Sequence, residues 1–191
     1  MRAVVYDFTE SRSGQHPRTF LGHGTDSAWK GSLVCDDYSG YKALFLDSGI
    51  AEVGCMAHAR RKFLELHLAN KSTLAATAIE FIGQLYGIER EVKDVAAEDR
   101  FRERRMRAAP VAQALHRWLL EYRPKVPDGS ATTKAMDYSL NRWAVLTRYL
   151  ADPALPIDNN VDEQQIRPWA TGLKNWLFAG RSSPGSAPQP S

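Results

Sequence analysis

The feature that most constrains the fold is a block of helical periodicity from about residue 55 to residue 151. Apolar residues recur there every three or four positions, which predicts amphipathic helices that pack on one another. Two such stripes are Met56, Ala59, Phe63 and Leu66, and Val111, Leu115, Trp118 and Leu119. We expect helices over about 55–69, from Ser72 to about 95, from Pro110 to the break at Pro124, and over 131–150.

Shorter apolar runs before this block predict strands over 3–8, 31–36 and 50–54. Between them we expect a polar turn over 9–18 and short helices over 17–23 and 38–45. After the block, Asp158, Asn159 and Asn160 are good helix-capping residues and predict a last helix to about Pro168, with a further short helix over 173–179. This order fits a small α/β core that is interrupted by a helical insertion.

Composition narrows the class of protein. The chain has 191 residues, 43% of them hydrophobic, which suits one ordinary domain and excludes disordered, collagenous and membrane chains. Its formal charge of +3 permits a nucleic-acid partner without requiring one. Two cysteines are too few for a disulfide scaffold, so we expect a reduced, cytoplasmic setting. The apolar runs are too short for a membrane span or a signal peptide, so we expect neither.

Phosphate-binding and nucleophile motifs are missing from the sequence. It contains no Gly-x-x-x-x-Gly-Lys-Ser/Thr loop, no Gly-x-Gly-x-x-Gly turn and no Gly-x-Ser-x-Gly elbow. These absences weaken the ATPase, dinucleotide-binding and α/β-hydrolase interpretations. Cys55 and His58 have a metal-like spacing, but without a second such pair a buried cysteine and a half-buried histidine are the better interpretation.

Asp36 and Asp37 follow the predicted strand over 31–36. Functional groups of α/β proteins gather at the carboxyl ends of strands, although an acid in that position is also an ordinary turn residue. Cys35 points to the opposite face from its neighbours, so we expect it in the core.

Glu163 lies one turn into the last predicted helix, on the same face as Asn160 and Arg167. The face is either solvated, with a Glu163–Arg167 pair, or it presents a carboxylate to a cation while the other two side chains position phosphates. Carboxylates from two different elements can hold two metal ions for phosphoryl transfer.

Several basic or aromatic residues are candidates for DNA contacts, although exposed faces and core packing are the alternatives. They are Arg60, Arg61, Lys62, the run over 100–107, Trp169, Lys174, Asn175 and Trp176.

Five segments in order resemble the insertion-sequence 66 family of bacterial transposases. Residues 6–17 resemble the family's segment before the first core helix, and residues 33–41 its strand ending in Asp-Gly-Tyr-x-Gly-Tyr. Residues 55–63 resemble its Cys-x-x-His-x-Arg-Arg-Lys-Phe helix, residues 156–168 its Asp-Asn-Asn-x-x-Glu-Arg-x-x-Arg-Pro element, and residues 172–180 its Gly-Arg-Lys-Asn-Trp-Leu-Phe run. The match spans nearly all of residues 4–180.

The resemblance implies a ribonuclease-H-like core in which Asp, Asp and Glu bind two Mg²⁺ (or Mn²⁺) ions for DNA nicking and strand transfer. The second acid then falls on Asp36 and the third on Glu163. Asn160, Arg167, Lys174, Asn175 and Trp176 would join Arg60, Arg61 and Lys62 in contacting transposon ends and target DNA, with a homo-oligomer possible. The implied division is a partial core over 1–54, a helical insertion over 55–151, the core helix with the third acid over 152–180, and a Pro/Ser/Gly-rich disordered tail over 181–191.

Some positions depart from the family pattern. Asp37 replaces a glycine, Gln164 and Leu173 replace arginines, and too little chain separates Asp7 from Asp36 for Asp7 to be the first acid. We therefore expect an α/β chain with an incomplete ribonuclease-H-like core, truncated at both ends and inactive by itself. The alternatives are a non-catalytic DNA-binding or oligomerisation module and a product that does not fold.

Overall fold

The computed structural model describes residues 5, 9, 11, 13–46, 49–161 and 163–165. The chain divides into two compact units, one of Asp7–Asn159 and one of Met1–Tyr6 with Asn160–Ser191, and each is described by itself. Apart from Val5, the strand predicted over 3–8 lies outside the described residues, and so do the helix predicted over 173–179 and the tail over 181–191.

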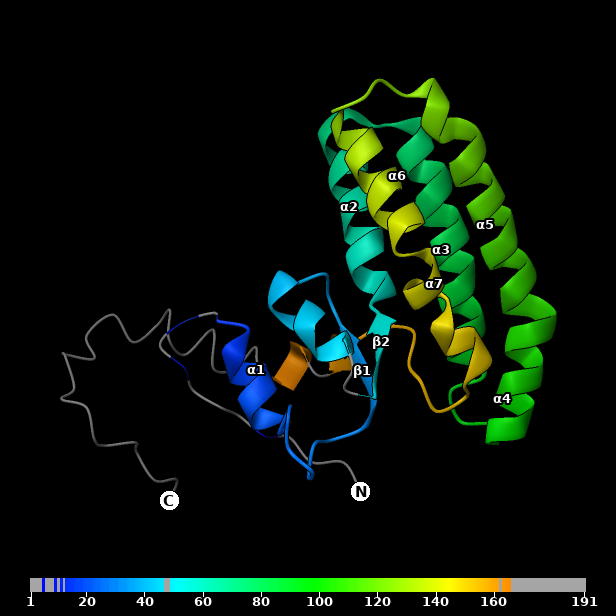
Figure 1. Cartoon of the computed structure of the whole chain (residues 1–191). Coiled ribbons are helices and arrows are strands. Elements are labelled where there is room, and N and C mark those ends of the chain that lie inside the picture. The colour runs from blue at the N-terminus through cyan, green and yellow to red at the C-terminus, as the bar shows by residue number, and fades with distance from the viewer. Residues whose placement is uncertain are drawn as a thin grey trace, which may run out of the picture. The chain divides into compact units, whose positions relative to one another are not determined.

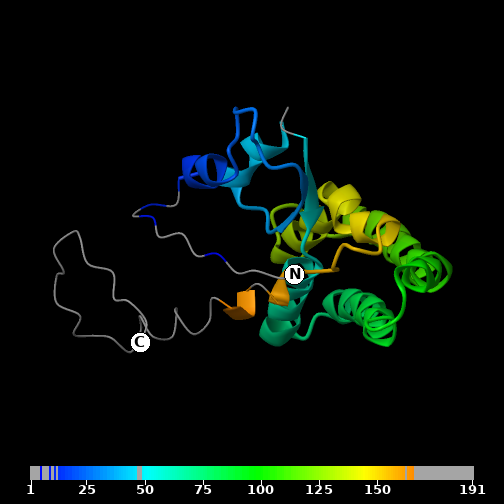
Figure 2. The ribbon, with the colours of Figure 1, turned by 90° about the horizontal axis from the view of Figure 1, so that it is seen from below.

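Four helical segments of the larger unit pack side by side. They are α2 (Met56–Asn70), α3 (Thr73–Glu91), α5 (Ala109–Tyr122) and α6 (Ala131–Asn141). Each contacts the next in the chain and α6 returns to α2, so that the four form a closed bundle (Figures 1 and 2). Every residue of the predicted 56–66 stripe is buried in its core, as are Leu115 and Leu119, whereas Val111 and Trp118 are partly buried against it.

Serine caps begin two of these helices. The side chains of Ser72 and Ser130 accept hydrogen bonds from the backbone N–H groups of Ala75 and Thr133, 3.2 and 3.1 Å away. Each bond satisfies one N–H that has no partner within the helix. The start at Ser72 is confirmed, but α3 ends at Glu91 rather than near residue 95.

Pro110 lies in the first turn of α5, as predicted, but the charged segment before it is helical as well. Helical backbone runs without interruption from α4 (Ala97–Glu103) through a π-helical turn (Arg104–Ala108) into α5. Proline lacks an N–H and its ring crowds the carbonyl of the residue four positions before it. The wider π turn lies where that crowding would fall, so Pro110 is accommodated inside a continuous helix.

The single helix predicted over 131–150 is wrong, because the chain breaks at Arg142. The break leaves α6, the short α7 (Trp143–Leu146) and a 3-10 helix (Arg148–Ala151). Ala144, an apolar residue of the predicted helix, is exposed. At the break, Arg142 turns toward the strands and is buried, a contact that no periodicity within 131–150 could indicate.

The two described strands form a small parallel sheet beside the bundle. β1 (Gly31–Cys35) pairs with β2 (Ile50–Gly54), with Gly31 opposite Ile50 and Cys35 opposite Gly54. The strand predictions are confirmed to within one residue. A 3-10 helix, η1 (Ser39–Phe45), connects them, and α1 (Gln15–Phe20) begins and ends earlier than predicted. The described part of the chain is thus mostly helical with a two-stranded parallel sheet, and it contains no helix long and apolar enough to cross a membrane.

Candidate functional site at the carboxyl end of β1

Asp36 follows β1 directly, and its carboxylate is held in place by the backbone. Its Oδ1 accepts a hydrogen bond from the N–H of Tyr38 at 3.1 Å, which fixes the turn that leaves the strand. The preceding Cys35 is buried, as predicted. Burial, followed by the nearby Glu52 carboxylate, raises the pKa of the Cys35 thiol to about 12.

A cavity of about 230 Å³ lies beside Asp36. It is bounded by side chains from the segment before α1, from α1 itself and from the turn after β1. The lining residues are Thr9, Ser11, Ser13, His16, Pro17, Asp36, Tyr38 and Tyr41. Two segments that carry the family resemblance, residues 6–17 and 33–41, therefore meet around one cavity.

Hydrogen bonds order the polar groups of this cavity. The Oγ of Ser11 lies 2.9 Å from Nε2 of His16, and the hydroxyl of Thr9 donates to the carbonyl oxygen of Ser11 at 2.9 Å. The Oγ of Ser13 accepts from the backbone N–H of Gln15 at 3.2 Å. Sequence reasoning gave these residues no role, although they stand inside the matched segments.

Two glycines make the approach of α1 to η1 possible. A Cβ on Gly14 would lie 2.5 Å from the carbonyl oxygen of Gly40, and a Cβ on Gly40 would lie 2.3 Å from the ring of Tyr38. The first contact is with backbone and leaves no room for a side chain at Gly14, whereas the second is with the end of the Tyr38 side chain, which can move. The cavity beside Asp36 therefore depends on glycine at position 14.

Asp37, the departure from the family's glycine, belongs to a separate network of charges. Its Oδ1 is 2.6 Å from Nη1 of Arg142 and 2.6 Å from Nζ of Lys42, and Nη2 of Arg142 is 2.6 Å from Oε1 of Glu52. Arg142 thus joins the helix break to the turn after β1 and to the middle of β2. No sequence pattern singled it out, because its partners lie 105 and 90 positions away.

The segment that leads toward Glu163 is anchored near the carboxyl end of β2. The N–H of Met56, just after β2, donates to the carbonyl oxygen of Ile157 at 3.0 Å. The hydroxyl of Tyr86 donates to Oδ2 of Asp158 at 2.5 Å. Burial and this hydrogen bond raise the pKa of Tyr86 above its ordinary value.

Residues 160–161 and 163–165 are helical, consistent with the predicted start of the last helix. Glu163 and Asn160 belong to the smaller unit, so a meeting of Glu163 with Asp36 stays a prediction. Arg167, Trp169, Lys174, Asn175 and Trp176 lie outside the described residues.

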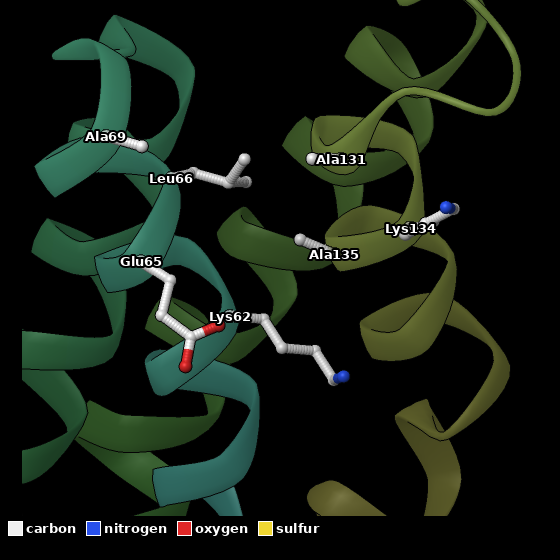
Figure 3. A pocket seen from close by; sticks show the side chains of 7 residues that line it. All are labelled: Lys62, Glu65, Leu66, Ala69, Ala131, Lys134 and Ala135. Carbon is white, nitrogen blue, oxygen red and sulfur yellow. The ribbon is translucent and has the colours of Figure 1, made fainter.

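The predicted basic segment lies on α2, where Arg61 and Lys62 are exposed and Arg60 is partly buried. A groove of about 330 Å³ between α2 and α6 is lined by Lys62, Glu65, Leu66, Ala69, Ala131, Lys134 and Ala135 (Figure 3). The Nζ of Lys62 lies 4.5 Å from the ring centroid of Tyr138. The sequence did not indicate a role for Lys134, because only the pairing of α2 with α6 brings it near Lys62.

Cys55 is buried, and its burial raises the pKa of its thiol. Within the described ranges, no group of three or more His, Cys, Asp or Glu side chains is arranged to hold a metal ion. Asp36 would thus need ligands from elsewhere to form a metal centre.

Comparison with known proteins identifies the family. The profile described as "Transposase IS66 family" matches residues 1–187, so the chain belongs to that transposase family. Three proteins of Sinorhizobium fredii (strain NBRC 101917 / NGR234) are similar to it: the uncharacterized proteins y4jD, y4hP and y4qI, with 33%, 31% and 34% identity over 96%, 93% and 95% of the chain. The chain spans 36%, 34% and 34% of their lengths. No solved structure matches it.

Proposed function

We propose that the chain is part of the catalytic domain of a metal-dependent, DDE-type transposase with a ribonuclease-H-like core. In this proposal Asp36 is the second acid and Glu163 the third. The supporting observation is the convergence of two family segments around a cavity at the carboxyl end of β1, with Asp36 in its wall. Ligands in α/β folds bind outside the carboxyl ends of strands.

The residues around Asp36 suit a magnesium ion. The cavity offers a carboxylate and the hydroxyls of Thr9, Ser11 and Ser13, and Mg²⁺ prefers oxygen ligands, often one or two carboxylates with several waters. When bound, such an ion would stabilise negative charge on a phosphodiester. The backbone bond from Tyr38 orients the Asp36 carboxylate before any ligand arrives.

The anchoring of residues 157–158 supports Glu163 as the partner acid. Because β1 and β2 are parallel, their carboxyl ends lie at one edge of the sheet. The carbonyl oxygen of Ile157 accepts a hydrogen bond from Met56, just past the end of β2. Glu163 follows six positions later in the chain (163 − 157). The assignment of Glu163 itself rests on the resemblance of residues 156–168 to the family's acidic element.

Binding of Mn²⁺, followed by the electron paramagnetic resonance of the free ion, tests the assignment. We expect Asp36→Asn and Glu163→Gln each to weaken binding about tenfold or more, since each removes a charged ligand. Asp26→Asn, at an exposed aspartate, is the matched control. Equal affinity in Asp36→Asn and Asp26→Asn would remove Asp36 from the metal site.

The proposal also holds that this chain is inactive alone, because the resemblance of its motifs to the family pattern gives positions for only two of the three acids. Two carboxylates hold a metal pair weakly and misplace the attacking oxygen. We expect no Mg²⁺-dependent nicking of supercoiled plasmid. Robust nicking that Asp36→Ala abolishes would contradict this and restore Asp7 as the first acid.

A non-catalytic DNA-binding module is the second candidate function, and the groove between α2 and α6 favours it. Lys62 extends from α2 toward α6, which carries Lys134 (Figure 3). Two lysines at one groove can contribute contacts to the phosphates of a DNA backbone. In a gel-shift assay we expect Lys62→Ala with Lys134→Ala to weaken binding and to lower the salt slope by about two.

Two matched variants complete that assay. Lys93→Ala, at an exposed lysine outside the groove, should leave the affinity unchanged. Binding that survives Glu163→Gln and fails in the double-lysine variant would favour the binding module over the enzyme.

A further inference from the structure

The cavity beside Asp36 has a composition that disfavours a bare anion. Among the described residues that line it, the carboxylate of Asp36 is accompanied by hydroxyls, an imidazole, two phenol rings and a proline ring, without a lysine or arginine. The negative charge of Asp36 would repel a phosphate, whereas a cation or a neutral group placed beside these side chains would not meet that repulsion.

The polar groups of the cavity supply hydrogen-bond donors whichever tautomer His16 adopts. A neutral imidazole and a hydroxyl carry one hydrogen each, and the contact between His16 and Ser11 uses only one of them. The pair therefore keeps one hydrogen for another acceptor. Ser13 adds a second, because its Oγ accepts from Gln15 and its own hydrogen remains to be donated.

The remaining walls are flat and apolar. Tyr38 and Tyr41 meet edge to face, with ring centroids 5.3 Å apart, and Pro17 lines the same cavity. Aromatic rings of this kind stack on unpaired bases. A volume of about 230 Å³ is smaller than the 300 Å³ or more of typical drug-sized pockets. Such a space suits a single heterocycle with carbonyl acceptors.

We propose that this cavity holds one unpaired nucleobase of the DNA strand that is presented to Asp36. The inference rests on the proposed function, which it deepens. Because the two tyrosine rings are perpendicular, one of them supplies the face on which the base lies and the other closes the edge, while Ser13 and the Ser11–His16 pair donate to its carbonyl oxygens. Removing a base from its stack costs free energy, and these contacts offset that cost.

Titration of the full chain with thymidine, a neutral nucleoside, tests the cavity by nuclear magnetic resonance. We expect saturable shifts of the ring signals of His16, Tyr38 and Tyr41. His16→Ala should weaken binding several-fold, because it removes the side chain that orders the Ser11 hydroxyl. His16→Gln should keep most of the affinity, because its amide can hydrogen-bond to the Oγ of Ser11 from the place of Nε2. His23→Ala is the matched control, at a histidine outside this cavity.

Three results would overturn the inference: no binding of thymidine by the chain, equal affinity in His16→Ala and the unsubstituted chain, or shifts at His16 with inorganic phosphate but not with thymidine. Mn²⁺ binding by the same variants separates the two proposals. Retained Mn²⁺ binding without thymidine binding defeats the nucleobase cavity alone. Thymidine binding with Mn²⁺ affinity indifferent to Asp36→Asn defeats the metal assignment and leaves the cavity.

Discussion

The helical bundle and the region around the strands use charged residues in opposite ways. In the bundle, the guanidinium of Arg104 is 2% exposed and binds both oxygens of Glu89, at 2.9 and 2.7 Å. It also donates to the carbonyl oxygens of Tyr149, Asp152 and Leu155. Around the strands, Asp36 is half-buried in a cavity wall beside hydroxyls.

The difference separates residues that stabilise the fold from residues that can bind a ligand. A buried charge with every hydrogen bond satisfied fixes the packing of its neighbours and has no capacity left for a ligand. A half-buried carboxylate at a cavity retains such capacity. Variants of the bundle should therefore change the free energy of unfolding, and variants of the cavity should change binding.

The largest effect is expected from Arg104→Ala. It leaves the Glu89 carboxylate and three carbonyl oxygens without their buried partner. Breaking a buried ion pair costs about 3–5 kcal/mol of unfolding free energy. Urea unfolding followed by circular dichroism measures it. The control is Arg102→Ala, whose side chain pairs with Asp99 at the surface and should cost less than about 1 kcal/mol. Equal losses of unfolding free energy in the two variants would contradict the structural role of the buried Arg104.

Arg142→Ala should have the next largest effect, because Arg142 joins the two regions. Its partners Asp37 and Glu52 are 41% and 16% exposed, so water compensates part of the loss. We expect a cost of about 2–3 kcal/mol, below the range for fully buried pairs. Hydrogen exchange should show β1 and β2 losing protection while α3 and α5 keep theirs. Uniform loss in both regions would mean that they unfold as one unit.

A smaller, graded effect is expected at alkaline pH. Because the pKa of Cys35 is raised to about 12 in the folded chain, the unfolded chain releases its thiol proton first as the pH rises above about 9. Stability should therefore fall between about pH 9 and 12, by at most about 1.4 kcal/mol per pH unit from this group. Urea midpoints at pH 8 to 11 measure the slope. Cys35→Ala should flatten it, and an unchanged slope would assign the loss to other groups, such as Tyr138, whose pKa is also raised to about 12.

The smallest effect on stability is expected from Asp36→Asn. Asparagine keeps an oxygen for the N–H of Tyr38, and the side chain is only half-buried. The change in unfolding free energy should stay within about 0.5 kcal/mol, while Mn²⁺ binding weakens about tenfold or more. A large destabilisation would place Asp36 among the structural residues and remove the contrast between the regions.

Much of the local structure could be predicted. The strands 31–36 and 50–54 appear within one residue, and the serine-capped helices begin where expected because caps and apolar spacing act over a few residues. Pro110 and Arg142 could not be interpreted in the same way. A π-helical turn accommodates Pro110 within the helix. The break at Arg142 depends on its contacts with Asp37 and Glu52, which are distant in the sequence.

The sequence by itself determined where the helices of the bundle begin at Ser72 and Ser130, the two strands, the position of Asp36 after β1 and the membership of a transposase family. Only the tertiary structure brought His16 and the serines before α1 to Asp36, and Lys62 to Lys134. The physical reason is range: helix caps and periodicity depend on neighbours within a turn or two. The cavity depends instead on the glycine contact between α1 and η1, and the groove on the pairing of α2 with α6.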